Sequence, residues 1–132
     1  MNKIISGILL SLSKLLVIPS SLAADSEGNY AIWGEGGASC YKYSKARIAE
    51  KDESFKAYLR GYLTSFNTSS ADTYSISGAK NLRSMLEWLD EYCDEKSIDS
   101  YDRAIHMLIS DIEDDRYKTP VTQGITKGWG KK

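Results

Sequence analysis

Asp102, His106 and Ser110 are the residue types of a serine-hydrolase triad, and they follow one another at intervals of four residues. In that chemistry a histidine takes the proton of the serine hydroxyl while a carboxylate orients the imidazole. Side chains four apart are neighbours on one helix face, but three groups on a single helix seldom reach the geometry of the reaction, and no oxyanion hole is suggested. We therefore predict an exposed helical stripe here and do not expect an enzyme.

Metal and phosphate chemistry is not indicated either. His106 is the single histidine, and no cluster of histidine and cysteine has the spacing of a transition-metal site. Gly34, Gly36 and Gly37 do not precede a helix in any phosphate-loop pattern. We expect neither a metal nor a cofactor.

A secretory signal peptide is predicted for residues 1–23. Lys3 lies in a short positive start, residues 4–18 are mostly apolar, and small residues precede a cleavage point after Ala23. A retained membrane anchor is the alternative, but Lys14 interrupts the apolar run, which falls short of the ~20 residues needed to span a bilayer. The expected location is therefore periplasmic or secreted, without membrane insertion after cleavage.

The two cysteines, Cys40 and Cys93, lie 53 positions apart (93 − 40) and allow one intramolecular pairing. A disulfide persists in the oxidising compartments to which exported proteins are sent. We expect a Cys40–Cys93 disulfide, the alternative being two buried free thiols.

A chain that begins after Ala23 has 109 residues (132 − 23), which is enough for one domain with a modest core. Without Lys3 and Lys14 it carries 15 of the 17 basic residues, against 18 acidic residues. This mildly acidic balance argues against nucleic acid as the main partner.

Apolar residues recur at steps of three and four, which is the period of a helix and not of a strand. The predicted fold class is all-α, a small bundle of about four short helices stapled by the disulfide. The fourth helix is expected to begin at the cap Ser97, with Ile98 in its apolar stripe. The expected helices are residues 40–49, 53–66 with Asp52 as the cap, 78–95 and 97–115, and residues 67–77 are expected to form a loop. The expected organisation is a signal peptide (1–23), an irregular N-terminal arm (24–38), a helical domain (39–116) and a flexible tail (117–132).

Five carboxylates crowd the second half of the third predicted helix, where like charges repel and the helix macrodipole disfavours negative charge. A solvated face softened by Arg83 and Lys96 is the simplest explanation; the functional alternative is a docking surface for a basic partner protein, or a pH-sensitive patch. Trp33 and Trp129 are candidate aromatic contacts of such an interface. We call the carboxylates the acidic ridge: Glu87, Asp90, Glu91, Asp94 and Glu95.

Four short motifs between Ser39 and Ile112 carry a family resemblance. They are Ser39-Cys40 followed by Tyr43, Glu53-Ser54-Phe55, Gly61-Tyr62 followed by Asn67, and Glu91-Tyr92-Cys93. In these motifs the chain resembles the HdeA/HdeB family of periplasmic acid-stress chaperones. The resemblance implies an HdeA-like, non-enzymatic helical protein of the stress response, often dimeric, which loosens at low pH and exposes apolar surface to unfolding client proteins.

Loosening of the fold in acid depends on the pKa values of its carboxylates. The reference pKa of carboxylates is near 4, so below about pH 3 most of them are neutral, and positive self-repulsion favours expansion. The crowded carboxylates of the acidic ridge should have raised pKa values, so their protonation would stabilise the fold as the pH falls. Loosening therefore requires other carboxylates, with depressed pKa values in salt bridges.

Two functions follow as expectations. The first is an acid-responsive periplasmic chaperone whose partners are unfolding client proteins, with a homodimer as a further assembly. The second is an immunity or inhibitor protein, similar to those of type VI secretion, that binds a secreted toxin through the acidic ridge and the two tryptophans.

Overall fold

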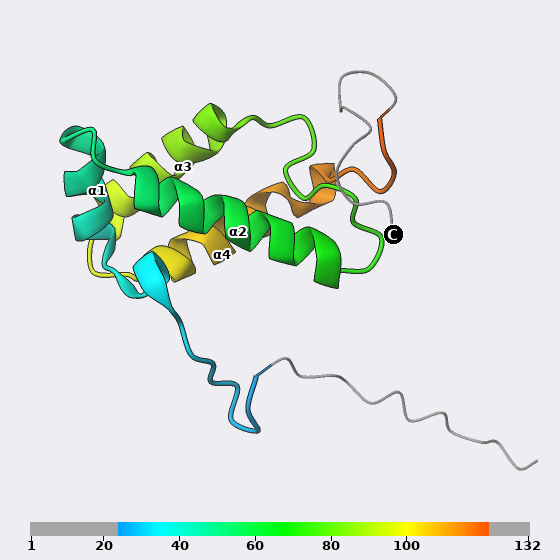
Figure 1. Cartoon of the computed structure of the whole chain (residues 1–132), viewed down its shortest axis with the longest axis horizontal. Helices are drawn as coiled ribbons and strands as arrows, with labels where there is room; N and C mark the ends of the chain where they lie inside the picture. Colours follow the sequence, from blue (N-terminus) through cyan, green and yellow to red (C-terminus); the bar gives the residue numbers. More distant parts are fainter. Residues whose placement is uncertain (1–23, 122–132) are drawn as a thin grey trace, which may run out of the picture. The chain divides into compact units, whose positions relative to one another are not determined.

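The computed structural model describes residues 24–121 of the 132-residue chain. These residues form four α-helices, two short 3-10 helices and no β-strand, so the prediction of an all-α fold is confirmed (Figure 1). None of the helices in this part of the chain combines the length and the apolar content needed to cross a membrane. The expected signal peptide, residues 1–23, and residues 122–132 of the expected tail lie outside the described residues. The elements are η1 (Gly34–Gly37), α1 (Cys40–Ile48), α2 (Glu53–Ser69), α3 (Leu82–Glu95), α4 (Tyr101–Ile112) and η2 (Glu113–Asp115).

Residues 24–31 belong to a unit separate from the helical unit that begins at residue 32. A turn organises them, in which the Asp25 carboxylate accepts hydrogen bonds from the backbone N–H groups of Asn29 at 2.8 Å and Glu27 at 2.9 Å. These two bonds lower the pKa of Asp25. Gly28, inside the turn, has a φ of 85°, a conformation that glycine adopts without steric cost.

Two serines cap the starts of α1 and α4 and also connect these two helix starts. Ser39 Oγ accepts from the N–H of Lys42 at 3.3 Å, and Ser100 Oγ accepts from the N–H of Arg103 at 3.2 Å. Each bond satisfies an N–H group that a helix start leaves free. Ser39 and Ser100 form an isolated antiparallel bridge as well. The starts of α1 and α4 are therefore held side by side.

The predicted start of α4 at Ser97 is wrong. The backbone carbonyl of Ser97 accepts a hydrogen bond from the N–H of Tyr41 on α1, at 2.9 Å. This contact holds the segment after α3 as a loop, and the helix begins only after its cap, Ser100. Ile98, predicted to lie in the apolar stripe, is consequently 92% exposed.

The start of α3 also differs from the prediction, because the helix begins at Leu82 and not at Gly78. Gly78 has a φ of 54°, and a Cβ atom there would collide with the backbone carbonyl oxygen of Asp115. A close approach of two backbone segments therefore requires glycine at this position. The helix is capped instead by Asn81, whose side-chain oxygen accepts from the N–H of Ser84 at 3.0 Å.

α2 continues to Ser69 and does not stop at Phe66 as predicted. In its last turn Ser69 Oγ donates to the Ser65 carbonyl at 2.8 Å. Asn67, predicted to begin a loop, is helical, and its side-chain oxygen accepts from the N–H of Ile76 at 2.7 Å. The end of the helix thus fixes the loop that follows it.

Part of the predicted irregular arm is regular. η1 packs against α2 and α4. Gly36 is buried in this contact, where a Cβ atom would collide with the hydroxyl of Tyr58. Glycine is therefore required for η1 to lie so close to α2.

The disulfide and three aromatic rings form the centre of the core. Cys40, the first residue of α1, is bonded to Cys93 near the end of α3, which confirms the predicted pairing. The rings of Tyr43 and Tyr101 stack with their centroids 4.7 Å apart. Phe55 meets both rings edge-on, at 5.4 and 5.0 Å. The aromatic cluster therefore links α1, α2 and α4, while the disulfide links α1 to α3.

Candidate functional site

Arg47, near the end of α1, binds two aspartates from different parts of the chain. Its Nε and Nη2 donate to the two carboxylate oxygens of Asp90 on α3, at 2.8 and 2.7 Å. Its Nη1 donates to Asp52, the residue before α2, at 2.9 Å. Two-pronged pairs between a guanidinium and a carboxylate are among the strongest polar contacts in proteins. One side chain therefore ties α1 both to α3 and to the start of α2.

Tyr43 and Lys56 complete this cluster. The Tyr43 hydroxyl donates to Asp90 at 2.7 Å, and Lys56 Nζ lies 3.2 Å from the Asp52 carboxylate. Burial raises the pKa of Tyr43, and the hydrogen bond to Asp90 raises it further, so the hydroxyl remains a donor. We call the cluster the aspartate network: Tyr43, Arg47, Asp52, Lys56 and Asp90.

Asp52 is the buried carboxylate of the aspartate network. The residue is 3% exposed. Burial alone would raise its pKa, but the hydrogen bonds from Arg47 and Lys56 outweigh burial, and the pKa of Asp52 lies below its usual range. The sequence predicted only a helix cap at this position, whereas the side chain makes no capping hydrogen bond and pairs with the two cations instead.

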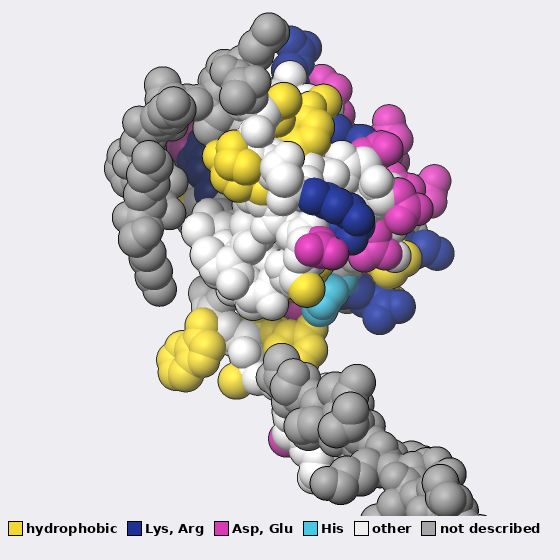
Figure 2. Space-filling view, turned by 90° about the vertical axis from the view of Figure 1, so that its right-hand side faces the viewer, with side chains coloured by type: hydrophobic (Ala, Val, Ile, Leu, Met, Phe, Trp, Pro, Cys, Tyr) yellow, Lys and Arg dark blue, Asp and Glu magenta, His cyan; other side chains and the backbone are white. Residues whose placement is uncertain are grey.

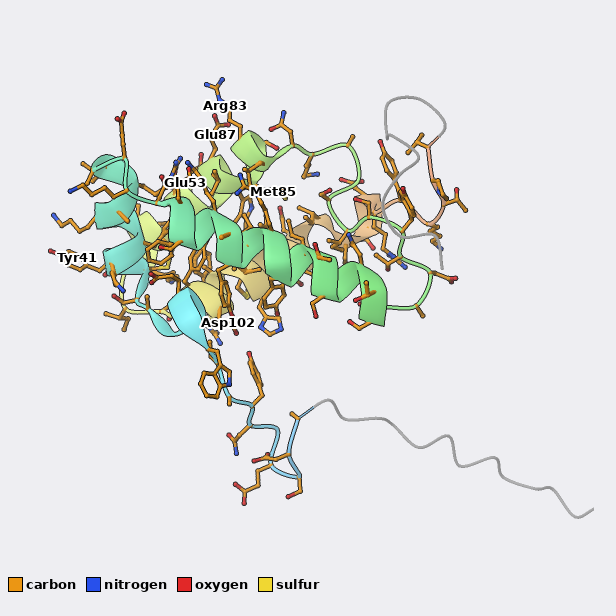
Figure 3. All side chains as sticks on the ribbon, in the orientation of Figure 1. Tyr41, Glu53, Arg83, Met85, Glu87 and Asp102 are labelled. Carbon is orange, nitrogen blue, oxygen red and sulfur yellow. A yellow bond between two sulfur atoms is a disulfide. The ribbon has the colours of Figure 1, made fainter. Side chains whose placement is uncertain are left out.

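The acidic ridge does not form one continuous surface. Asp90 turns toward α1 and belongs to the aspartate network. Glu87 pairs with Arg83, one turn earlier on α3, at 3.0 Å, and Figure 3 shows the two side chains together on α3. Glu91 and Asp94 face a groove, and Glu95 is exposed at the last position of the helix.

This groove runs between α1 and α3, beside the aspartate network. Its larger part has a volume of about 570 Å³. A smaller hollow of about 190 Å³ shares three lining residues with it and passes over Cys93 of the disulfide. We call the two together the α1–α3 groove. Besides Arg47 and Asp90, its side chains include Tyr41, Ser44, Ile48, Glu50, Glu91 and Asp94.

Asp102, predicted to lie on an exposed stripe with His106 and Ser110, is buried, being 2% exposed. Its carboxylate accepts a hydrogen bond from the Tyr58 hydroxyl at 2.9 Å and so joins α4 to α2. His106 is half exposed, with Nδ1 3.7 Å from Asp102, and Figure 2 shows the histidine among basic and acidic side chains on its face. Ser110 is exposed, as predicted. The prediction was wrong for Asp102 because the carboxylate serves a contact between helices.

The structure describes only one of the two tryptophans that were predicted as aromatic contacts. Trp33, directly before η1, is 84% exposed. Trp129 lies outside the described residues. Within residues 24–121, no three histidine, cysteine or acidic side chains are grouped closely enough to hold a metal ion.

No protein-family model, curated protein or solved structure matches this chain. The resemblance to the HdeA/HdeB family therefore stays a prediction from the sequence motifs, and the function must be argued from the site itself.

Proposed function

We propose that the chain is a non-enzymatic, acid-responsive chaperone that is exported to the periplasm or secreted. In this proposal it is closed near neutral pH and opens in acid to bind unfolding proteins. The observation that carries the proposal is the buried Asp52 carboxylate, which is ion-paired to Arg47 and Lys56 and has a lowered pKa. This is the kind of carboxylate that acid loosening requires.

The direction of the pH effect follows from linkage. The pKa of Asp52 is lower in the folded protein than the ~3.9 expected for an unfolded chain. Ionised Asp52 therefore stabilises the fold above about pH 4, and this stabilisation is lost as the pH falls through the folded pKa. Acid thus weakens the aspartate network.

Protonation of Asp52 would leave Arg47 with one anion fewer at the junction of three elements, which is costly where water is partly excluded. The other lysines and arginines stay charged, so their repulsion adds to the effect. The aspartate network adjoins the aromatic cluster of Tyr43, Phe55 and Tyr101 through Tyr43, whose hydroxyl donates to Asp90, and all three rings are fully or nearly fully buried. Exposure of this cluster would supply the apolar surface that captures a client.

The disulfide limits how far the chain can expand when acid opens it. Cys40 is the first residue of α1, whereas Arg47 is one residue from its end. Acid would therefore release α1 at one end while the bond to Cys93 retains it at the other. The opened chain would stay compact enough to close again when the pH is restored.

The test is a titration of the oxidised chain, residues 24–132, from pH 7 to pH 2. Near-UV circular dichroism reports the packed aromatic core, a fluorescent dye for apolar surface reports opening, and aggregation of a denaturing client protein is followed at both ends. The proposal expects loss of the near-UV signal, dye binding and suppressed aggregation in acid. A domain that stays packed and inactive down to pH 2 would contradict it.

A second function, an immunity or inhibitor protein that binds a toxin, is favoured by a separate observation. The α1–α3 groove is open in the folded protein, and its carboxylates Glu50, Glu91 and Asp94 form no ion pair within residues 24–121. Such a protein would be rigid and bind one partner at neutral pH. Glu91→Lys should then abolish binding without unfolding the chain, which circular dichroism and a binding assay would separate.

A further inference from the structure

We infer that the α1–α3 groove binds a basic, amphipathic helical segment of a partner protein near neutral pH. Apolar side chains of the segment would contact Tyr41 and Ile48, and its lysines or arginines would face the acidic wall. This inference names the partner chemistry for the second function above and does not depend on the acid response.

The apolar part of the groove comes from α1. Tyr41 and Ile48 are seven residues apart, so they lie on one face of the helix, roughly 10 Å from each other along its axis. Ile48 is 80% exposed, and Tyr41 is exposed and points away from the bundle (Figure 3). Ser44, midway between them, is small and leaves the space that the groove occupies. Two apolar anchors with a hollow between them match the spacing of side chains on a docked helix.

The charge of the groove determines which charge a binding partner must carry. Glu50, Glu91 and Asp94 have no ion-pair partner in the described part of the chain. Arg47 is engaged by its two aspartates, and Lys45 lies over the ring of Tyr41, with Nζ 5.3 Å from the ring centroid. Lys45 also lines the groove, but four carboxylates (Glu50, Asp90, Glu91 and Asp94) outnumber the two cations, so the net charge is negative. This charge steers a cationic segment toward the groove and disfavours an acidic one.

Glu50 adds a negative charge to the groove at a position where its backbone conformation is strained. It follows α1 with a φ of 55°, a left-handed conformation in which glycine is preferred. The N–H of Lys51 donates to the Ala46 carbonyl at 2.9 Å, which is the hydrogen bond of a glycine-type helix end. The chain thus carries a carboxylate that lines the groove at a position where a residue without a side chain would be more favourable.

Other occupants fit the groove less well. A metal ion needs converging ligands, and no such group of three exists among residues 24–121. A second copy that placed groove against groove would set like charges against each other. The chain's own residues Lys127, Lys131 and Lys132 are basic, so the test must separate them from a partner.

The probe is a synthetic peptide of about 15 residues with leucines at helical spacing and lysines between them. Its binding to the oxidised chain, residues 24–132, is measured at pH 7 by calorimetry, with backbone amide shifts mapping the contact. We expect shifts on both sides of the groove. We also expect weaker binding by a peptide of the same composition in scrambled order, because the scrambled peptide has no apolar face.

Charge reversal at one residue inside the groove and one outside it gives the matched comparison. Glu91→Lys should weaken binding roughly tenfold, since it places a cation in the wall of the groove. Asp111→Lys changes the net charge equally at an exposed position of α4 outside the groove and should alter binding by less than about twofold. Near-UV circular dichroism checks that both variants are folded.

Four results would overturn the inference. Equal losses in both variants, or equal binding of the scrambled peptide, would mean non-specific attraction. Tighter peptide binding when Lys127, Lys131 and Lys132 are all changed to Gln would assign the groove to the chain's own end. Groove shifts that depend on protein concentration without peptide would assign it to a second copy. None of these outcomes involves the acid response, which is measured separately.

Discussion

Arg47 and Asp90 are 43 residues apart in the sequence, yet they form a two-pronged ion pair in which Nε and Nη2 lie 2.8 and 2.7 Å from the carboxylate oxygens. The remaining guanidinium nitrogen, Nη1, donates to Asp52 at 2.9 Å. One cation therefore bridges two carboxylates at the junction of α1, α2 and α3. This arrangement makes the packing of α1 dependent on ionised aspartates.

Replacing Arg47 by Met should lower the free energy of unfolding by about 2 kcal/mol at pH 7, because two aspartates lose their shared cation. The value is below that of a fully buried pair since Arg47 is about one quarter exposed. Urea denaturation measures it. The matched control is Arg83→Met, which removes an exposed ion pair with Glu87 and should cost less than about 0.5 kcal/mol. Equal effects would mean that the aspartate network has no special weight.

The helices were predictable because their signals are local. Apolar steps of three and four mark each helix, and two cysteines allow one bond, so the fold class and disulfide needed no tertiary information. The starts of α3 and α4 were not predictable in this way. Gly78 is held by its contact with the backbone of Asp115, and Ser97 by the N–H of Tyr41. Both contacts come from segments distant in sequence.

The candidate site shows a signal that was present in the sequence but not used. Asp90 is four residues after Leu86 and three before Cys93, so it lies at the edge of the helical face that carries the buried stripe, between that stripe and Asp94 one turn further on. A carboxylate at core spacing predicts a buried polar contact, and Asp102, three residues before Ile105, follows the same rule. The partner of such a carboxylate cannot be read from spacing, since Arg47 lies on another helix.

Asp52→Asn should make the stability of the domain less dependent on pH. At pH 7 the variant should be less stable by about 2 kcal/mol, since a hydrogen-bonded charged group is lost. The folded pKa of Asp52 is depressed, so the wild-type advantage exists above about pH 4 and shrinks as the pH falls below it. Urea unfolding at a series of pH values measures the difference between the two proteins.

Asp111→Asn is the control for that series, because Asp111 is an exposed aspartate of α4. Its stability should follow the wild-type curve at every pH. If the Asp52→Asn difference stayed constant down to pH 2.5, the pKa of Asp52 would not be depressed by the fold, and the acid response would need another source.

Removing the disulfide by changing Cys40 and Cys93 to Ser should cost about 4 kcal/mol, the chain-entropy value for a loop that closes over a separation of 53 residues. The variant should also expand more in acid than the oxidised protein, because α1 loses its remaining attachment to α3. Small-angle scattering at pH 7 and pH 2 measures both states. Equal dimensions of the two proteins at pH 2 would show that the bond does not limit the opened chain.

Replacing Glu50 by glycine should affect the stability of the domain and the binding proposed for its groove in opposite directions. Glu50→Gly should raise the free energy of unfolding by about 1 kcal/mol, because glycine adopts the left-handed φ of 55° without the steric cost. The same change removes a carboxylate from the groove wall and should weaken binding of the lysine-rich peptide. Urea denaturation and calorimetry measure the two effects.

Glu50→Gln is the matched variant, since it removes the charge but keeps a side chain in the left-handed conformation. It should weaken peptide binding as much as Glu50→Gly does, while leaving the stability within about 0.5 kcal/mol of wild type. A Glu50→Gly variant that gains stability and binds the peptide unchanged would show that the carboxylate has no part in the groove. Opposite signs for stability and binding are expected because the backbone at this position favours glycine whereas the groove favours a negative charge.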